Sequence, residues 1–347
     1  MTFSEIQERR EHLLQGFLFV LLAGLLQGTF ILPMSLVKDW SWEHTWAAFS
    51  FLGMFAFNWI ITLLAFPNIF AVYSSSPMRD LFLLALFGVG WGIGAVLFGL
   101  GMDRLGMSLG YPIIMGLIAS LGALIPLVVF FPHSLLTARG TLLLIGTLIV
   151  ILGIVFVSTG GSRRVSLEKK SHSGQASAFS AAITIAVLAG ILSCLPNVGM
   201  AFGNNVVKAA ENSGISPTSA GNAVWAFLFT FGFVVNLGYC IYLMGSRNTL
   251  GRFWSRETPR NLAWSAMMAL MWIGSFYLYG LGAARLGRWG VVAGWPLFIT
   301  LSIVAGFLWG LWRGEWRDAP VSARRMLNQG LAILIFAVII VGLSNFF

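Results

Sequence analysis

The sequence has few charged residues: they make up 10% of its 347 positions, whereas a soluble domain carries about 25%. These charges are confined to short segments between long apolar runs. An apolar run of about 20 residues crosses the roughly 30 Å hydrocarbon core of a bilayer as a helix. The scarcity of charge therefore excludes an ordinary soluble domain and predicts an integral membrane protein.

Cysteine and histidine are also scarce, with two cysteines and four histidines in the chain. Cys194 and Cys240 both lie in apolar runs, so we expect neither a disulfide framework nor a metal site. The sequence contains no Gly-x-Ser-x-Gly, His-Glu-x-x-His or Cys-x-x-Cys motif and no phosphate-binding loop. We therefore expect no cofactor and no enzyme. No short apolar segment with a cleavage site follows the polar first 13 residues, so we expect no cleaved signal peptide.

The net charge of +9 does not indicate nucleic-acid binding, because the basic residues lie in the connections between apolar runs. Cytoplasmic connections of membrane proteins are rich in Lys and Arg. The odd-numbered connections hold 14 of these residues, whereas the even-numbered connections and the termini hold 7. This distribution predicts that both termini lie outside the cytoplasm.

Ten membrane-spanning helices are predicted from the apolar runs. Their approximate ranges are 14–35, 45–66, 80–102, 107–131, 140–160, 179–205, 218–244, 261–282, 289–312 and 326–346. The longest connection, 160–178, is polar and rich in Gly and Ser, and predicts a flexible linker. It separates two halves of five spans each, residues 1–159 and 179–347.

A repeated phrase supports this division. "GLGMDRLG" begins at Gly99 and "GLGAARLG" at Gly280, and six of their eight letters agree. Each phrase closes the third span of its half, and Trp91 and Trp272 precede the two phrases at the same distance. Because five is odd, the second half must cross the membrane in the opposite sense. The predicted fold is all-α, with ten transmembrane helices arranged as two inverted five-helix repeats, as in many secondary transporters.

Several blocks of the sequence resemble one known family. They are "KDWSWEHTW" (38–46), "PNIFAVYSS" (67–75), "WGIGAVLFGLGMDRLGMSLG" (91–110), "VNLGYC" (235–240) and "WGLWRGEW" (309–316). In content and order they resemble the bacterial L-rhamnose–proton symporter family of the drug/metabolite transporter superfamily. The resemblance implies proton-coupled uptake of a monosaccharide across the bacterial inner membrane. The wider superfamily places both termini in the cytoplasm, unlike the charge distribution.

A carrier for a small neutral polar solute must offer hydrogen-bonding partners within the membrane, because an unpaired hydroxyl there is costly. Amide and phenol groups both donate and accept hydrogen bonds. The Trp91 and Trp272 rings could stack on the C–H face of a sugar. The same amides could instead tie helices together. The candidate substrate-binding residues are Gln27, Asn58, Trp91, Asn197, Asn204, Asn236, Trp272 and Tyr277.

Span six carries the sequence "SCLPNVGMAFGNN", in which Pro196 and two glycines lie among three amides. Proline frees a backbone carbonyl within a helix. We expect a break at this point that turns backbone groups toward the substrate. Tryptophans at span ends are instead expected to anchor the chain at the membrane surface. They are Trp40, Trp42, Trp46, Trp312 and Trp316.

No ionisable residue lies at the centre of any predicted span, although proton coupling usually depends on an intramembrane carboxylate or histidine. The acids nearest to the spans are at their ends. Glu43 and Asp103 are the candidates for proton coupling, and Asp103 could pair with Arg104. His44 and His133 are expected at the surface.

Other functions remain open. An efflux carrier for small amphipathic compounds would have a pocket rich in Met and Phe, and the chain has 13 Met and 29 Phe. A membrane enzyme acting on lipids would need a cluster of acids or histidines, and the histidines are scattered. A sensor subunit would need a soluble module, and no such segment is evident. We expect as partners a sugar, protons and the lipid bilayer, and no nucleic acid.

Overall fold

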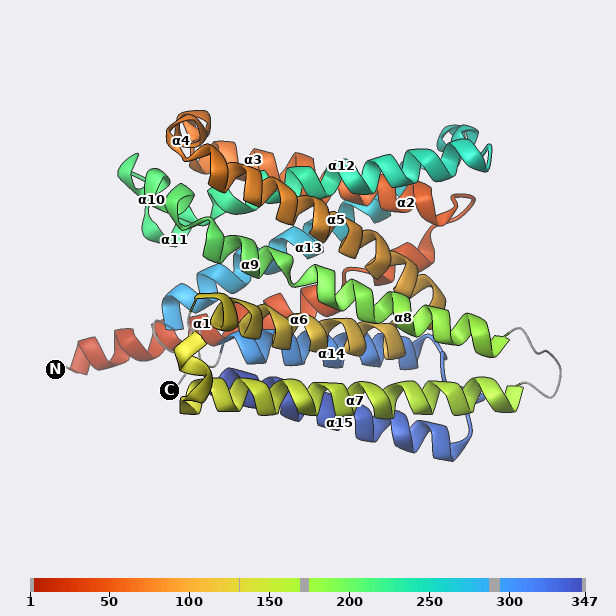
Figure 1. Cartoon of the computed structure of the whole chain (residues 1–347). Coiled ribbons are helices and arrows are strands. Elements are labelled where there is room, and N and C mark those ends of the chain that lie inside the picture. Colours follow the sequence, from red (N-terminus) through yellow and green to blue (C-terminus); the bar gives the residue numbers. More distant parts are fainter. Residues whose placement is uncertain (1–2, 131, 169–174, 287–293, 345–347) are drawn as a thin grey trace. The chain divides into compact units, whose positions relative to one another are not determined.

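The computed structural model describes residues 3–130, 132–168, 175–286 and 294–344, and within them it contains helices and no strand (Figure 1). Nine helical segments of this described part are long and apolar enough to cross a membrane, with mean hydropathies of 1.3–2.8. They coincide with nine of the ten predicted spans. A shorter apolar helix, Leu297–Trp312, lies where the remaining span is expected. The chain is therefore an all-helical integral membrane protein.

The helices also expose large apolar side chains, as expected for lipid-facing surfaces. Leu64 is 81% exposed, and Phe82 and Leu148 are each 66% exposed. Such surfaces would be unfavourable in water but are favourable against hydrocarbon. In lipid the backbone has no water to bond to, and a helix satisfies its own backbone hydrogen bonds. Long apolar segments in a membrane therefore form helices.

The chain divides into two compact units. The first comprises residues 1–29, 97–191 and 275–347. Within it α7 packs along α15, α1 packs along α14, and α6 packs against α7, α14 and α15 (Figure 1). Its elements are α1 (Phe3–Thr29), the end of α5 (Met78–Leu105), α6 (Met107–Phe130), η3 (Pro132–Leu136), α7 (Ala138–Glu168), most of α8 (Gln175–Ser193), the end of α13 (Thr258–Leu286), α14 (Trp295–Trp312) and α15 (Val321–Leu343).

The second unit comprises residues 30–96 and 192–274. Within it α12 packs along α2, η2 and α9. Its elements are η1 (Leu32–Leu36), α2 (Trp42–Phe49), η2 (Ser50–Phe57), α3 (Asn58–Ala65), α4 (Ile69–Ser75), the start of α5, the end of α8, α9 (Leu195–Phe202), α10 (Asn204–Asn212), α11 (Pro217–Ala220), α12 (Asn222–Ser246), η4 (Leu250–Trp254) and the start of α13.

Small residues allow α5 and α12 to approach closely within the second unit. A Cβ on Gly88 would lie 2.4 Å from the carbonyl oxygen of Leu228, and a Cβ on Gly92 would lie 2.8 Å from the Cα of Gly232. Helices in membranes commonly pack through such small-residue faces. A larger side chain at either glycine would therefore force the two helices apart.

Two interruptions distinguish the spans. Residues Ser50–Phe57 form a π-helix, η2, in the middle of the second span; π-helical segments are rare and often occur at functional sites. In the sixth span α8 ends at Ser193, and α9 begins at Leu195 with Pro196 in its first turn. The break predicted in span six is therefore present, whereas the sequence did not predict the π-helix.

The predicted linker is largely helical in the structure. Residues 160–168 continue α7, and residues 175–178 begin α8. Residues 169–174 of the predicted linker lie outside the described residues. Its Gly and Ser content did not prevent helix formation, because α7 continues to pack there: a Cβ on Gly160 would lie 3.0 Å from the carbonyl oxygen of Ala323 in α15.

Candidate functional site

Seven aromatic side chains form a continuous series in the second unit, which we call the aromatic ladder. Consecutive ring centroids are 4.6–5.9 Å apart, and the five inner rings are buried. Indole and phenyl faces of this kind bind apolar and C–H surfaces. The members, in order, are Trp42, Trp46, Phe49, Trp272, Trp91, Phe229 and Trp225.

The structure brings together the two tryptophans that the sequence singled out. The Trp91 and Trp272 ring centroids are 5.9 Å apart with an interplanar angle of 21°, and the side chains are 7% and 6% exposed. Gly232 makes room for this pair, since a Cβ there would lie 2.4 Å from the Trp91 ring. The tryptophans that precede the two repeated phrases, one on α5 and one on α13, thus form one stacked pair.

Asn236 on α12 is fully buried and is engaged by protein on both ends of its amide. Its Oδ1 accepts a hydrogen bond of 2.8 Å from Nε1 of Trp46, and its Nδ2 donates to the carbonyl oxygens of Gly92 (3.0 Å) and Gly232 (2.8 Å). These bonds join α2, α5 and α12. The geometry indicates that Asn236 ties these helices together and orients the Trp46 ring.

Polar atoms without partners cluster at the start of the second span. Nε1 of Trp42, Nδ1 of His44 and Oγ of Ser50 are buried and have no hydrogen-bond partner among the described residues. Nearly all buried polar groups in proteins are paired, so each exception calls for an explanation. Trp42 and Ser50 follow the same helix stripe as the ladder residue Trp46, with spacings of four residues. This stripe combines aromatic faces with unused hydrogen-bonding capacity.

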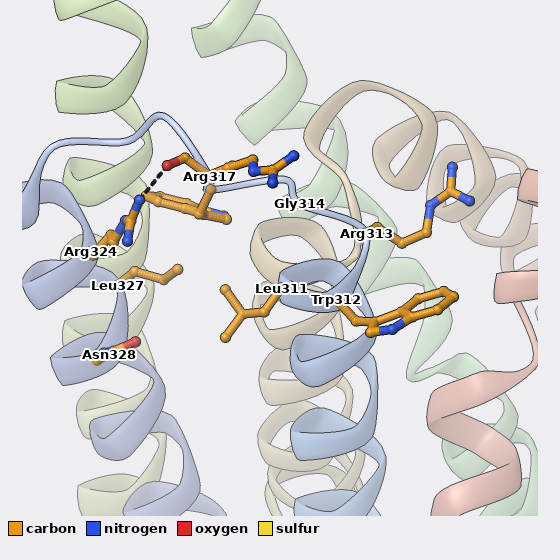
Figure 2. A pocket seen from close by; sticks show the side chains of 9 residues that line it. Leu311, Trp312, Arg313, Gly314, Arg317, Arg324, Leu327 and Asn328 are labelled. Carbon is orange, nitrogen blue, oxygen red and sulfur yellow. Dashed lines mark hydrogen bonds between the residues drawn. The ribbon is translucent and has the colours of Figure 1, made fainter.

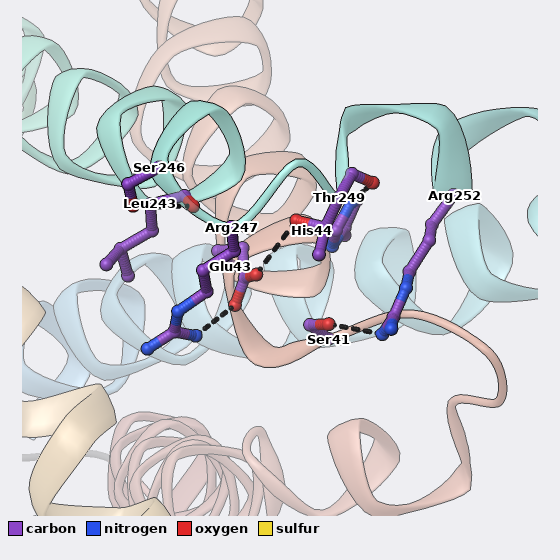
Figure 3. Close-up of polar contacts among 8 residues, drawn as sticks. All are labelled: Ser41, Glu43, His44, Leu243, Ser246, Arg247, Thr249 and Arg252. Atoms are coloured by element: carbon purple, nitrogen blue, oxygen red, sulfur yellow. Dashed lines mark hydrogen bonds and ion pairs between the residues drawn. The ribbon is translucent and has the colours of Figure 1, made fainter.

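A polar network closes one end of the second unit (Figure 3). Glu43 is fully buried in the first turn of α2; its Oε2 lies 3.1 Å from Nη1 of Arg247, and its Oε1 accepts a 3.2 Å hydrogen bond from Oγ1 of Thr249. The partial positive charge of a helix N-terminus also favours a carboxylate there. Glu43 is therefore a buried, ion-paired carboxylate at the end of a span.

The same network corrects the expectation that His44 lies at the surface. His44 is fully buried, and its Nε2 lies 2.8 Å from the carbonyl oxygen of Thr249. A carbonyl only accepts, so this nitrogen carries the proton, and in the neutral ring Nδ1 is an acceptor. The ring of Phe253 covers the imidazole, with centroids 4.8 Å apart. His133 is exposed, as expected.

The expectation of tryptophan anchors is wrong for three residues. Trp40, Trp46 and Trp316 are buried, with 8%, 1% and 3% of their surface exposed. Burial is tolerated because each indole N–H donates a hydrogen bond to a group inside the protein. Trp40 donates to the carbonyl oxygen of Arg252, and Trp316 donates to Oγ of Ser108. Trp312 is 73% exposed, consistent with a membrane anchor. Trp42 is half-buried within the ladder.

Two of the remaining candidates belong to the first unit. Gln27 is 6% exposed; its Oε1 accepts a 2.6 Å hydrogen bond from Oγ of Ser275, and its backbone carbonyl accepts one of 2.6 Å from the hydroxyl of Tyr111. Tyr277 is half-buried on α13. Gln27 and Tyr277 therefore lie in a different unit from the aromatic ladder.

The other amide candidates differ widely in environment. Asn58 is 1% exposed and donates to the carbonyl of Met54 in its own helix at 3.4 Å. Asn197 is half-buried on α9, and its amide makes no hydrogen bond within the described residues. Asn204 is exposed and begins α10, beyond the end of the sixth span at Phe202. Of the three, Asn197 has the capacity to bind a solute that the protein itself does not use.

Asp103 lies at the end of α5 and is exposed. In the described part of the chain no ion pair joins it to Arg104, in contrast to the expected local pair. Asp103 therefore differs from Glu43, which is buried and ion-paired.

A second carboxylate, the half-buried Glu315, connects the sequence blocks 309–316 and 91–110. Oε1 and Oε2 of Glu315 accept hydrogen bonds from the backbone N–H groups of Met107 (2.8 Å) and Ser108 (2.9 Å), and Oε2 also accepts one from the Ser108 hydroxyl. Glu315 thus caps the N-terminus of α6, where free N–H groups need acceptors. Gly106, with a φ of +77°, ends α5 just before this cap.

Comparison with known proteins identifies the family to which the chain belongs. A family described as L-rhamnose-proton symport protein matches residues 10–346. The chain is similar to L-rhamnose-proton symporters of Shigella dysenteriae serotype 1 and Shigella boydii serotype 18, each 30% identical over 95% of this chain and 97% of the relative. It is 29% identical to that of Escherichia coli strain 55989 over the same shares. No solved structure matches the chain.

Proposed function

Because this chain belongs to the L-rhamnose-proton symport protein family, we propose that it takes up a monosaccharide such as L-rhamnose together with protons across the bacterial inner membrane. The observation that carries this proposal is the match over residues 10–346, which includes every apolar span. The relatives are named for L-rhamnose and protons.

We assign the sugar-binding surface to the aromatic ladder and the adjacent stripe of α2. A monosaccharide has an apolar C–H face and a ring of hydroxyls. The stacked Trp91 and Trp272 offer faces for the former, and the unpaired Nε1 of Trp42 and Oγ of Ser50 offer partners for the latter. Asn197 is the third unpaired group available from the same unit.

Not all the predicted binding residues receive the same support. The hydrogen bonds of Asn236 and Gln27 are already made within the protein. Asn58 binds its own helix, and Asn204 lies outside the span. We therefore propose that Trp91, Trp272 and Asn197 contact the sugar, and that Asn236 holds the ladder in position.

Proton coupling is assigned to Glu43. Its buried carboxylate is neutralised by Arg247, and separation from Arg247 would leave an unpaired charge in a dry environment, which is strongly unfavourable. Uptake of a proton removes that cost. The two alternatives, Arg247 bound or a proton bound, link the protonation of Glu43 to the arrangement of this end of the unit.

The fold that we propose for this transport cycle is the ten-helix pair of inverted five-helix repeats, divided at the 160–178 segment. The units support it, because each repeat contributes its spans to them in the same way. The first and third spans of each half are shared between the units, the second belongs to the second unit, and the fourth and fifth to the first unit. The shorter apolar helix Leu297–Trp312 is then the ninth span.

With an even number of spans both termini lie on one side, and we propose the non-cytoplasmic side from the distribution of Lys and Arg. Reporter fusions at the two ends, one active in the periplasm and one in the cytoplasm, test this orientation. Activity of the cytoplasmic reporter at either end contradicts it.

Transport itself is tested in proteoliposomes that contain the purified chain. We expect uptake of labelled L-rhamnose that exceeds equilibrium when the outside is acidic and that collapses when a protonophore is added. A panel of unlabelled sugars then ranks specificity by competition. Absence of uptake or exchange of any sugar by folded protein would reject the proposal.

A further inference from the structure

A basic pocket lies in the first unit, at the connection between α14 and α15 (Figure 2). Its volume is about 520 Å³. We call it the arginine pocket. Its lining residues are Leu311, Trp312, Arg313, Gly314, Trp316, Arg317, Arg324, Leu327 and Asn328.

The arginine pocket carries positive charge that the protein does not neutralise. Arg313, Arg317 and Arg324 are exposed, and within the described residues none of them forms an ion pair. No lining residue is acidic. The nearby Glu315 is engaged by the N-terminus of α6. Guanidinium groups are well suited to bind the oxygens of a phosphate group.

Backbone geometry adds to the positive field. α15 begins at Val321 after Pro320, with no side-chain cap and no acidic residue in its first turn, whereas Arg324 follows closely. Basic residues near a helix N-terminus oppose the helix dipole. A bound anion near the N-terminus of α15 would offset both the positive end of the helix dipole and the repulsion between this end and Arg324. The Arg324 side chain is itself positioned by a hydrogen bond from its Nη2 to the carbonyl oxygen of Arg317, visible in Figure 2.

The pocket is also lined by apolar side chains, two of which are exposed. Leu311 is 41% exposed and Trp312 is 73% exposed. An exposed tryptophan at the end of a span lies at the depth of the lipid headgroups. The pocket thus joins guanidinium groups to an apolar surface at the level where a lipid phosphate meets its acyl chains.

We propose that the arginine pocket binds the headgroup of an anionic phospholipid, with its phosphodiester on Arg313, Arg317 and Arg324 and its acyl chains along Leu311 and Trp312. Basic pockets between membrane helices are a known means of recognising anionic headgroups. The inference concerns lipid binding and is independent of the sugar that is carried.

The test uses the full-length protein in detergent, titrated with phosphatidylglycerol, phosphatidylcholine or inorganic phosphate. Melting temperature and native mass spectrometry report binding. We expect phosphatidylglycerol to raise the melting temperature by mass action, and the other two to have much less effect. In the R313Q/R317Q/R324Q variant the affinity for phosphatidylglycerol should fall at least tenfold.

The matched control, R79Q/R104Q/R139Q, removes three exposed arginines elsewhere and should bind phosphatidylglycerol like the unchanged protein. A W312A variant, which retains all the charges, should bind it more weakly. An equal loss in the control would show a mere effect of net charge and overturn the proposal. Equal stabilisation by inorganic phosphate would assign the pocket to a free anion and would also overturn it.

Discussion

Glu43 and Arg247 form an ion pair whose partners differ sharply in exposure: the side chain of Glu43 is 0% exposed, whereas that of Arg247 is 55% exposed. Arg247 can therefore leave the pair and be hydrated, but Glu43 cannot. A buried charge that loses its partner is strongly destabilising, whereas an exposed one is hydrated. This asymmetry suits an exchange between arginine and proton on a single carboxylate.

Substitution of Glu43 by Gln should separate sugar movement from proton movement. The amide retains the shape and can still bond to Thr249, but it cannot bind and release a proton. We expect E43Q to exchange labelled for unlabelled sugar across the membrane while losing accumulation driven by a pH gradient. Counterflow and gradient-driven uptake in the same proteoliposomes measure the two activities.

The control for this prediction is D103N, which removes the other candidate carboxylate. Because Asp103 is exposed, D103N should accumulate sugar at close to the unchanged rate. Loss of accumulation in D103N with normal coupling in E43Q would reverse the assignment.

Replacement of Trp272 should weaken the binding of sugar and also lower the stability of the fold, because the buried indole packs against the rings of Phe49, Trp91 and Phe229. Loss of the indole removes one face of the Trp91–Trp272 stack, and aromatic contacts contribute about 0.5–1.5 kcal/mol beyond their buried area. We expect W272A to raise the KM for uptake about tenfold and W272F to give an intermediate value. Initial rates over a range of sugar concentrations give this order.

W312A serves as the comparison for Trp272, because the Trp312 side chain is 73% exposed. It should leave the KM for sugar unchanged. If W272A and W272F both transport with unchanged KM, the ladder is not a sugar platform.

The sequence alone predicted the membrane helices well, because each of them corresponds to a long apolar run of residues. Nine predicted spans coincide with apolar helices, and the Pro196 break is present. The π-helix at Ser50–Phe57 was not predictable, since its apolar sequence also suits an α-helix and the α12 surface against which it packs comes from a distant part of the chain. Tertiary context decided that segment.

Candidate site residues were predicted by chemical type, and their partners came from distant parts of the chain. Trp46 was assigned to the surface because it lies at a span end, but Asn236, 190 residues away, accepts its N–H. Phe49 and Phe229 gave no signal in a chain with 29 phenylalanines, although both belong to the ladder. Trp91 and Trp272 were singled out because each precedes one of the two similar phrases by the same number of residues.

Substitutions of Asn236 and Asn197 should have different effects, because the side-chain amide of Asn236 is hydrogen-bonded within the protein and that of Asn197 has no partner in the described part of the chain. N236A leaves the Trp46 indole N–H without its acceptor in a buried site, and an unsatisfied buried donor costs about 1–3 kcal/mol. We expect a clearly lower melting temperature for N236A. N197A removes an amide without a protein partner and should keep the melting temperature while reducing sugar uptake. Thermal unfolding and uptake measured on the same preparations test both; a reversed pattern would exchange their roles.

Glu315 should stabilise the fold through the α6 N-terminus. The carboxylate accepts hydrogen bonds from the N–H groups of Met107 and Ser108, and such charge-assisted bonds are about twice as strong as neutral ones. E315Q retains one acceptor oxygen but turns an NH₂ group toward backbone donors. We expect a loss of about 1–3 kcal/mol and a lower melting temperature, measured by thermal unfolding of the full chain in detergent.

The matched control for E315Q is E257Q. Glu257 precedes α13 and pairs with Arg260, three residues further along the chain, at 3.7 Å, and both side chains are partly exposed. Surface pairs of this kind contribute about 0–1 kcal/mol, so E257Q should melt close to the unchanged protein. A second variant, S108A, keeps the two backbone bonds to Glu315 but removes the hydroxyl that also accepts from Trp316, so its effect should be smaller than that of E315Q. If E315Q melts no lower than E257Q, the backbone N–H groups of α6 do not depend on this carboxylate, and the close approach of the two sequence blocks rests on packing alone.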